Sequence, residues 1–277
     1  MKPGYIVTGI GVVLVLAGAV VAQQYLRAEG RVTRGAGRGM GDAARTPILV
    51  ELFTSEGCSS CPSADRLLAK LAVSQPIEGA EIIALEEHVD YWDHIGWRDP
   101  FSAADFTRRQ YDYGKHFHLD SVYTPQAVVD GQREFVGSDE GTAVSAIREA
   151  AAQEKARVGL QVTSEDTNQL RLNVSIDKLP KGNGSAQAVL AVAEDDLQVH
   201  VKSGENSGRN LVHHGVVRRL VPLGKMQDRA AFTTRVTVPL DRSWRRENLQ
   251  LVAFVQSESS RRILGVGSVP LTARPKG

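Results

Sequence analysis

The sequence contains few cysteines and no excess of charge of either sign. Only two of its 277 residues are cysteines, which excludes a disulfide scaffold and leaves packing to stabilise the fold. The 33 Lys and Arg residues balance 32 Asp and Glu residues, and a formal net charge of +1 gives no field that would attract nucleic acid. Hydrophobic residues make up 42% of the chain, which is typical of a globular protein with a sizeable core.

An apolar segment lies near the N-terminus. Residues Ile6–Ala22 contain no charged side chain, and Lys2 precedes them. The segment has the length of a short membrane-spanning helix or of a long signal-peptide core, and Ala22 before Gln23 is a small residue of the kind that a signal peptidase requires. We therefore expect residues 1–26 to be either a cleaved signal peptide or an uncleaved membrane anchor.

The segment that follows, residues 27–46, is rich in glycine and arginine and indicates a flexible linker. Its arginines argue against export, because positive charge beside an apolar segment tends to stay in the cytoplasm. We still expect the rest of the chain to be periplasmic or secreted, since an isolated pair of cysteines suits a compartment for thiol redox chemistry. An uncleaved segment would attach the protein to the inner membrane.

Two patterns divide the remaining chain. Between residues 47 and 156, short apolar strands alternate with amphipathic helices, which is typical of an α/β domain. From residue 157 to 272, several apolar runs alternate with period two between turn residues, which indicates an antiparallel sandwich. These predicted strands are 158–162, 170–176, 188–192, 233–238, 249–255 and 263–267. The sequence therefore predicts an α/β domain followed by an all-β immunoglobulin-like sandwich.

Both cysteines occupy one motif, Cys58-Ser59-Ser60-Cys61, between a predicted buried strand and a predicted helix. A thiol at a helix N-terminus faces unpaired N–H groups and the positive end of the helix dipole, and both stabilise the thiolate. We expect Cys58, the more exposed of the two, to attack a substrate disulfide and Cys61 to resolve the product. This redox-active disulfide requires no additional cofactor.

A strand, a CxxC motif and a helix in this order are the signature of the thioredoxin fold. The dipeptide Thr124-Pro125 precedes a predicted strand, where thioredoxin folds place a cis-proline that faces the disulfide. We expect Thr124 and Pro125 to bind the substrate backbone. Trp92 and Trp97, in a loop rich in His and Asp, either line a substrate groove or anchor that loop to the body of the protein.

These motifs together resemble a family of secreted bacterial thioredoxin-like proteins filed as a domain of unknown function. The matching segments are 51–62, 88–93 with 96–97, 109–110 with Tyr113, and 123–126. The resemblance extends over about residues 47–271 and implies a thioredoxin-like fold in residues 47–156 and export, but no substrate. The C-terminal part is similar to β-sandwich modules that follow redox domains in other secreted proteins.

Three functions are compatible with these features. The first is a thiol–disulfide oxidoreductase whose partners are protein thiols or disulfides, or a dedicated redox partner. The second is a periplasmic copper or zinc binding protein with Cys58, Cys61, His88 and His94 as ligands, because thiolates suit Cu(I) and imidazoles suit zinc. The third is a non-catalytic partner-binding protein with a permanently closed disulfide.

Several polar residues have no assigned role at this point. A buried acid behind the disulfide would move protons to Cys61, and Glu51, Glu86 and Glu87 are rival candidates for it. We expect Arg109 to pair with Asp90 or Asp93 and to support the loop. His213 and His214 are expected in a polar loop of the sandwich, where they form no catalytic set.

Overall fold

The computed structural model describes residues 1, 45–182, 184–227 and 230–271. The chain divides into two units, Met1–Ala43 and Ala44–Gly277, and the fold below is that of the second unit. The predicted signal peptide or anchor, and most of the predicted linker, lie outside the described residues. Within the described residues, no helix is both long enough and apolar enough to span a membrane.

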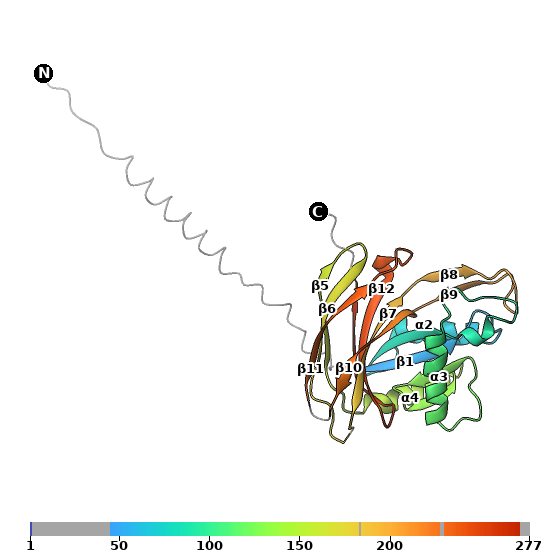
Figure 1. Ribbon diagram of the computed structural model, residues 1–277, viewed down its shortest axis with the longest axis horizontal. Helices are drawn as coiled ribbons and strands as arrows, with labels where there is room; N and C mark the ends of the chain where they lie inside the picture. Colours follow the sequence, from blue (N-terminus) through green and yellow to red (C-terminus); the bar gives the residue numbers. More distant parts are fainter. Residues whose placement is uncertain (2–44, 183, 228–229, 272–277) are drawn as a thin grey trace. The chain divides into compact units, whose positions relative to one another are not determined.

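The described part of the chain forms thirteen strands and three α-helices (Figure 1). In chain order they are β1 (Thr46–Thr54), α2 (Cys61–Ser74), β2 (Ala80–His88), α3 (Ala104–His116), β3 (Gln126–Val129), β4 (Arg133–Val136), α4 (Glu140–Ala151), β5 (Val158–Glu165), β6 (Gln169–Ile176), β7 (Ala186–Glu194), β8 (Leu197–His200), β9 (Asn210–His213), β10 (Val216–Met226), β11 (Phe232–Pro239), β12 (Leu249–Ser257) and β13 (Ile263–Pro270). Short 3-10 turns occupy Asp90–Trp92 and Arg246–Asn248.

Eight of the strands form one mixed sheet in the order β13-β12-β7-β10-β2-β1-β3-β4. The junction between its two halves is the parallel contact of β10 with β2, where Val216 lies opposite Glu86. The Glu86 N–H donates to the Gly215 carbonyl at 2.8 Å. Strands from both sides of residue 156 therefore share one hydrogen-bonded sheet.

The prediction of a thioredoxin-like α/β domain followed by a separate immunoglobulin-like sandwich is therefore wrong. The predicted strands are present, and the three-stranded sheet β11-β6-β5 does cover part of the larger sheet. The larger sheet, however, continues directly into β2 and β1. Periodicity within a segment predicts that it is a strand, but it does not identify the strand with which it pairs.

The core has a layer on each face of the large sheet. Leu49 of β1 and Phe254 of β12 belong to the same buried cluster as Phe106 of α3, so α3 covers one face. On the other face, Val50 packs with helices α2 and α4. Leu251 of β12 packs with the three-stranded sheet on that same face. Neighbouring residues on one strand thus belong to different clusters, as the alternation of side chains along a strand requires.

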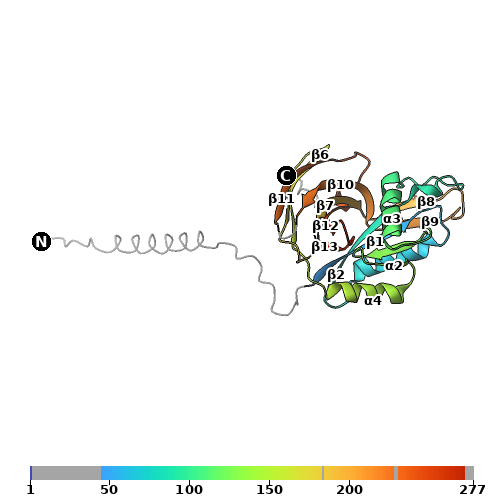
Figure 2. The same ribbon diagram turned by 60° about the horizontal axis from the view of Figure 1, so that its bottom comes forward.

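The hairpin β8–β9 is separate from the other two sheets and pairs only its own strands. It belongs to the C-terminal half of the chain but lies beside α2, which β9 contacts (Figures 1 and 2). This hairpin therefore brings a segment from beyond residue 196 to the N-terminal end of the helix that carries the cysteines.

Candidate functional site

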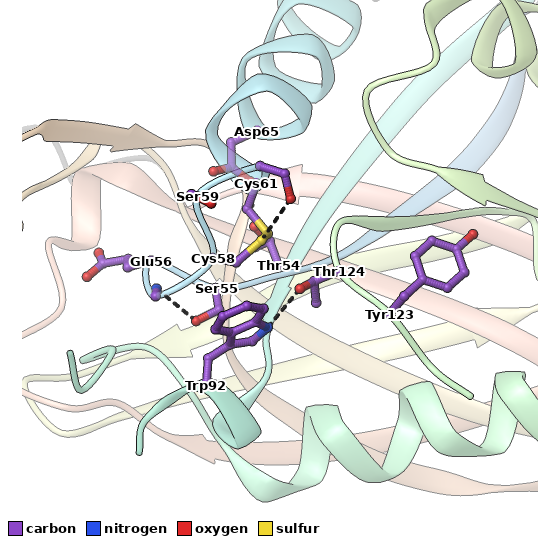
Figure 3. Close-up of a disulfide and its surroundings, with 12 residues drawn as sticks. Thr54, Ser55, Glu56, Cys58, Ser59, Cys61, Asp65, Trp92, Tyr123 and Thr124 are labelled. Carbon is purple, nitrogen blue, oxygen red and sulfur yellow. Dashed lines mark hydrogen bonds between the residues drawn. A yellow bond between two sulfur atoms is a disulfide. The ribbon is translucent and has the colours of Figure 1, made fainter. Parts of the chain in front are cut away.

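Cys58 and Cys61 form a disulfide at the junction of β1 and α2. Helix α2 begins at Cys61, and Pro62 occupies its first turn, where a missing N–H removes no intrahelical bond. The Sγ atom of Cys58 lies 3.4 Å from the Ser60 hydroxyl (Figure 3). The disulfide thus lies at the positive end of a helix dipole, as the strand–CxxC–helix pattern predicts.

The disulfide is buried. Cys58 is 1% exposed and Cys61 is 0% exposed, so neither sulfur is open to solvent and exposure hardly distinguishes the two. The turn of the β8–β9 hairpin covers the motif: Asn206 Nδ2 donates to the carbonyl oxygens of Glu56 at 2.8 Å and of Cys58 at 2.9 Å. Glu205 accepts a hydrogen bond from the Ser59 N–H at 3.0 Å. The covering residues come from about 150 positions further along the chain, so the local sequence gives no sign of them.

Thr124, one of the two predicted substrate-binding residues on this loop, lies beside the disulfide (Figure 3). The Thr124–Pro125 peptide bond is cis, as predicted, and Pro125 is buried. Trp92 Nε1 donates to Thr124 Oγ1 at 2.8 Å. A Cβ atom placed on Gly57 would lie 3.2 Å from Trp92 Cβ, so this tryptophan packs directly against the loop that carries Cys58.

Trp97 lies at a different place from Trp92. Its Nε1 donates to Glu56 Oε2 at 2.7 Å, and its Cβ lies close to Gly204 in the β8–β9 turn. Ser203 in the same turn donates to the Gly96 carbonyl. Trp97 therefore fixes the loop after β2 to the motif and to the hairpin, which agrees with the loop-anchoring role.

A buried cluster of imidazole and carboxylate groups lies next to the motif. Glu86, His88 and His213 each place one donor atom within 4.8 Å of those of the other two, and all three side chains are fully buried. His88 and Glu86 come from β2, and His213 ends β9. His213 also approaches Glu56, with 3.3 Å between Nε2 and Oε1.

This cluster changes the expectations for the histidines. His88 is buried, as a ligand would be, but the predicted partner His94 is exposed on a turn, and the two cysteines are bonded to each other. His213, expected in a polar loop without function, is a buried strand residue. Its partners lie more than 120 residues earlier in the chain, so only the tertiary structure identifies them.

Electrostatic interactions in the cluster are strong. Burial lowers the pKa of His88, but the adjacent Asp99 carboxylate outweighs it and raises that pKa to about 9. Asp99 Oδ2 lies 2.7 Å from His88 Nδ1 and also accepts the Glu56 N–H at 2.8 Å. The same loop carboxylate thus orients the imidazole and holds the backbone that precedes Cys58.

Asp65 is a buried acid on the helix that begins at Cys61. It follows Cys61 by four residues on α2 and lies near the disulfide (Figure 3). Burial, and after it the Glu86 carboxylate, raise its pKa to about 7, although the Thr54 hydroxyl donates to Oδ1 at 2.7 Å. The i, i+4 spacing places Asp65 on the same helix face as Cys61, so the sequence itself contains a signal for this acid.

Glu51 has a different environment from Asp65. Arg109 Nε donates to Glu51 Oε1, and Tyr113 Oη donates to Glu51 Oε2, both at 2.6 Å. Arg109 also lies 3.4 Å from Glu87 and donates to Gln256 of β12 at 3.1 Å. The prediction that Arg109 pairs with a loop aspartate is therefore wrong: it neutralises strand carboxylates and ties β1 to β12 through α3.

Comparison with known proteins identifies the family. A family model described as a protein of unknown function, DUF1223, matches residues 49–256. No curated protein matches the chain.

Two solved structures share much of the fold. A structural-genomics crystal structure of a protein from Agrobacterium tumefaciens is 26% identical, with a TM-score of 0.64, over 85% of this chain and 98% of that one. HBP35 of Porphyromonas gingivalis is 14% identical, with a TM-score of 0.58, over 85% of this chain and 79% of that one, and shares the fold alone. Of the resemblance drawn from the motifs around Cys58 and Tyr123, the domain of unknown function is confirmed: this chain belongs to the DUF1223 family of proteins of unknown function.

Proposed function

We propose that this protein is an exported thiol–disulfide oxidoreductase that acts on protein or small-molecule disulfides and dithiols through Cys58 and Cys61. The observation that carries the proposal is a disulfide at the start of α2 with the buried Asp65 one helical turn further on. The helix N-terminus favours a thiolate, and an acid whose pKa is about 7 can exchange a proton with a thiol at neutral pH.

The reaction proceeds in two exchanges. In the reduced protein, the Cys58 thiolate attacks one sulfur of a substrate disulfide, forms a mixed disulfide and expels the other substrate sulfur as a thiolate. Asp65 then takes the proton of Cys61, whose thiolate attacks Cys58 Sγ and releases the second substrate sulfur as a thiolate. The substrate gains two electrons and the protein is left with its disulfide. The reverse sequence oxidises a substrate dithiol.

Access to the sulfurs requires the β8–β9 turn to move. With Cys58 at 1% exposure, attack on or by this sulfur is blocked until the hydrogen bonds from Asn206 to the motif open. Trp92 and Thr124 lie on the loops beside the disulfide, where a substrate chain would replace the turn. Thr124 and Pro125 then bind the substrate backbone, and Trp92 packs against it.

Catalysis is tested with dithiothreitol-driven reduction of insulin and with oxidation of a dithiol peptide by the oxidised protein. Turnover in one of these assays, lost in Cys58→Ser and kept in Val73→Ala at the exposed far end of α2, supports the proposal. If the wild-type protein shows turnover in neither direction, it is not an oxidoreductase of this kind.

The burial of the disulfide favours a second candidate, a non-catalytic partner-binding protein. A permanently closed structural disulfide would also be buried under a turn from a distant part of the chain, as this one is. Thiol titration separates the two: a disulfide that resists millimolar dithiothreitol in the folded protein supports the structural role.

Export is part of the proposal. An oxidised cysteine pair in a chain with no other cysteine is compatible with an extracytoplasmic compartment, where disulfides persist. N-terminal sequencing of the protein recovered from periplasm and membrane fractions tests it. A chain starting near Gln23 in the periplasm indicates a cleaved signal peptide, and an intact chain in the membrane fraction indicates an anchor. An intact chain in the cytoplasm contradicts export.

A further inference from the structure

We propose that Glu86, His88 and His213 bind one divalent transition-metal ion, best matched by Zn²⁺, independently of the two cysteines. The donor atoms are Glu86 Oε2, His88 Nε2 and His213 Nδ1. Two carboxylate–imidazole separations in this set are 3.6 Å for His88 and 3.2 Å for His213, the second of which is a hydrogen bond that the ion would replace. A tetrahedral zinc ion with ligand distances of about 2.0–2.1 Å holds its ligands roughly 3.3–3.5 Å apart, so the carboxylate already lies at coordination spacing from both rings.

The backbone brings these three residues together from two elements. Glu86 and His88 are two residues apart on β2, so their side chains point to the same side of the strand. His213 reaches them from the end of β9, two residues before Gly215, whose carbonyl accepts the Glu86 N–H. Three ligands held by strands of the core give a rigid site and leave one tetrahedral position for a ligand from outside the chain.

An unpartnered polar atom points to a ligand. His88 Nε2 is fully buried and, among the described residues, has no hydrogen-bond partner. Buried polar atoms are almost always hydrogen-bonded, so such an atom requires an explanation. Its orientation toward Glu86 Oε2 at 3.6 Å is the one a shared metal ion would impose, because the ion replaces a hydrogen bond that is too long to form directly.

Each imidazole also has a carboxylate on its other nitrogen. His88 Nδ1 lies 2.7 Å from Asp99 Oδ2, and His213 Nε2 lies 3.3 Å from Glu56 Oε1. Metal-binding histidines commonly donate their second N–H to a carboxylate, which fixes the ring and makes the binding nitrogen a better donor. The Asp99–His88 contact is a hydrogen bond of this kind, and Glu56 lies beside His213 as an ion-pair partner.

The negative charge of the carboxylates in this cluster suits the binding of a divalent cation. Glu86, Asp99 and Glu56 place three fully or nearly fully buried carboxylates around two imidazole rings. Buried carboxylates are costly unless cations balance them, and protonated imidazoles or a bound dication can both do so. The donor set contains nitrogen and oxygen without sulfur, which suits zinc better than Cu(I). The ion would fasten β9, and with it the turn that covers Cys58, to β2.

The test uses the full-length protein after dialysis against EDTA, titrated with ZnCl₂ by calorimetry and checked by elemental analysis. We expect one zinc per chain and a higher melting temperature in the loaded protein. His88→Gln and His213→Gln should each weaken binding at least tenfold, as should Asp99→Asn through the orientation of His88. The matched control, His94→Gln on the exposed turn, and a Cys58→Ser/Cys61→Ser variant should bind as the wild type does.

Cobalt substitution keeps the test decisive if a histidine variant fails to fold. Co²⁺ in the wild-type protein should give the visible absorption of a tetrahedral nitrogen and oxygen site without a sulfur-to-cobalt charge-transfer band. A sulfur band, zinc binding lost only with the cysteines, or no binding to the wild type would overturn the proposal. Because the cysteine-free variant is expected to keep its zinc, this result stands apart from the redox proposal.

Discussion

Asn206 and Cys58 are joined by a hydrogen bond of 2.9 Å although 148 positions separate them in the chain. The same amide nitrogen donates to the Glu56 carbonyl at 2.8 Å, and Asn206 is fully buried. One side chain from the C-terminal half thus holds the loop that carries the proposed attacking sulfur and covers it. We therefore expect the reactivity of the disulfide to depend on how often this contact opens.

Replacing Asn206 by alanine should accelerate reduction of the disulfide. The substitution removes two hydrogen bonds, each with a net contribution of about 0.5–1.5 kcal/mol, so the open population should rise on the order of tenfold. The measurement is the rate of reduction by dithiothreitol at fixed pH. Asn210→Ala is the control, because Asn210 bonds to His200 within the same hairpin and leaves the motif untouched. Equal rates for Asn206→Ala and the wild type would show that the turn does not limit access.

Asp65 should make stability fall as pH rises. Its pKa is about 7 in the folded protein and about 4 when unfolded, so the native state binds the proton more tightly. The folded state is therefore favoured at low pH and loses this advantage between about pH 4 and 7. Above pH 7 the loss is on the order of 2–4 kcal/mol in free energy of unfolding.

The measurement for Asp65 is urea unfolding of the metal-free protein between pH 4.5 and 8.5. Asp65→Asn should flatten the pH dependence and be more stable than the wild type at the alkaline end. Asp120→Asn, on an exposed loop, should keep the wild-type profile. Parallel profiles for the wild type and Asp65→Asn would contradict a raised pKa at this position.

Arg109 should be essential for stability. Arg109→Met leaves Glu51 and Glu87 buried without their cation, and breaking a buried ion pair in this way costs about 3–5 kcal/mol. The double variant Arg109→Met/Glu51→Gln should recover part of the loss. Arg108→Met, one residue away on the exposed face of α3, should change the unfolding free energy by less than about 1 kcal/mol. Similar losses in the two single variants would argue against the network.

Local features of this fold could be predicted from the sequence. The alternation in residues 170–176 and 249–255 identified strands β6 and β12, and the apolar run before the cysteines identified β1. The CxxC spacing predicted a bonded pair at a helix start, and Thr124-Pro125 predicted the cis peptide. Each of these signals lies within one segment, so a pattern along the chain contains it.

Long-range contacts could not be predicted in this way. The pairing of β10 with β2 merges the two predicted domains, and it rests on a short parallel contact at Val216. The covering of Cys58 by Asn206 and the approach of His213 to Glu86 depend on the path of one hairpin. These contacts depend on how distant segments pack against each other. Neither residue spacing nor composition within a segment predicts that packing.

The measurement that tests the redox account most directly is trapping of a mixed disulfide. Cys61→Ser keeps the attacking sulfur and removes the resolving one, so incubation with a disulfide-bonded peptide should produce a covalent adduct on Cys58, identified by mass spectrometry of the intact protein. Cys58→Ser should form markedly less adduct under the same conditions. Equal labelling of the two variants, or no adduct on Cys61→Ser after the turn is loosened by Asn206→Ala, would contradict Cys58 as the nucleophile.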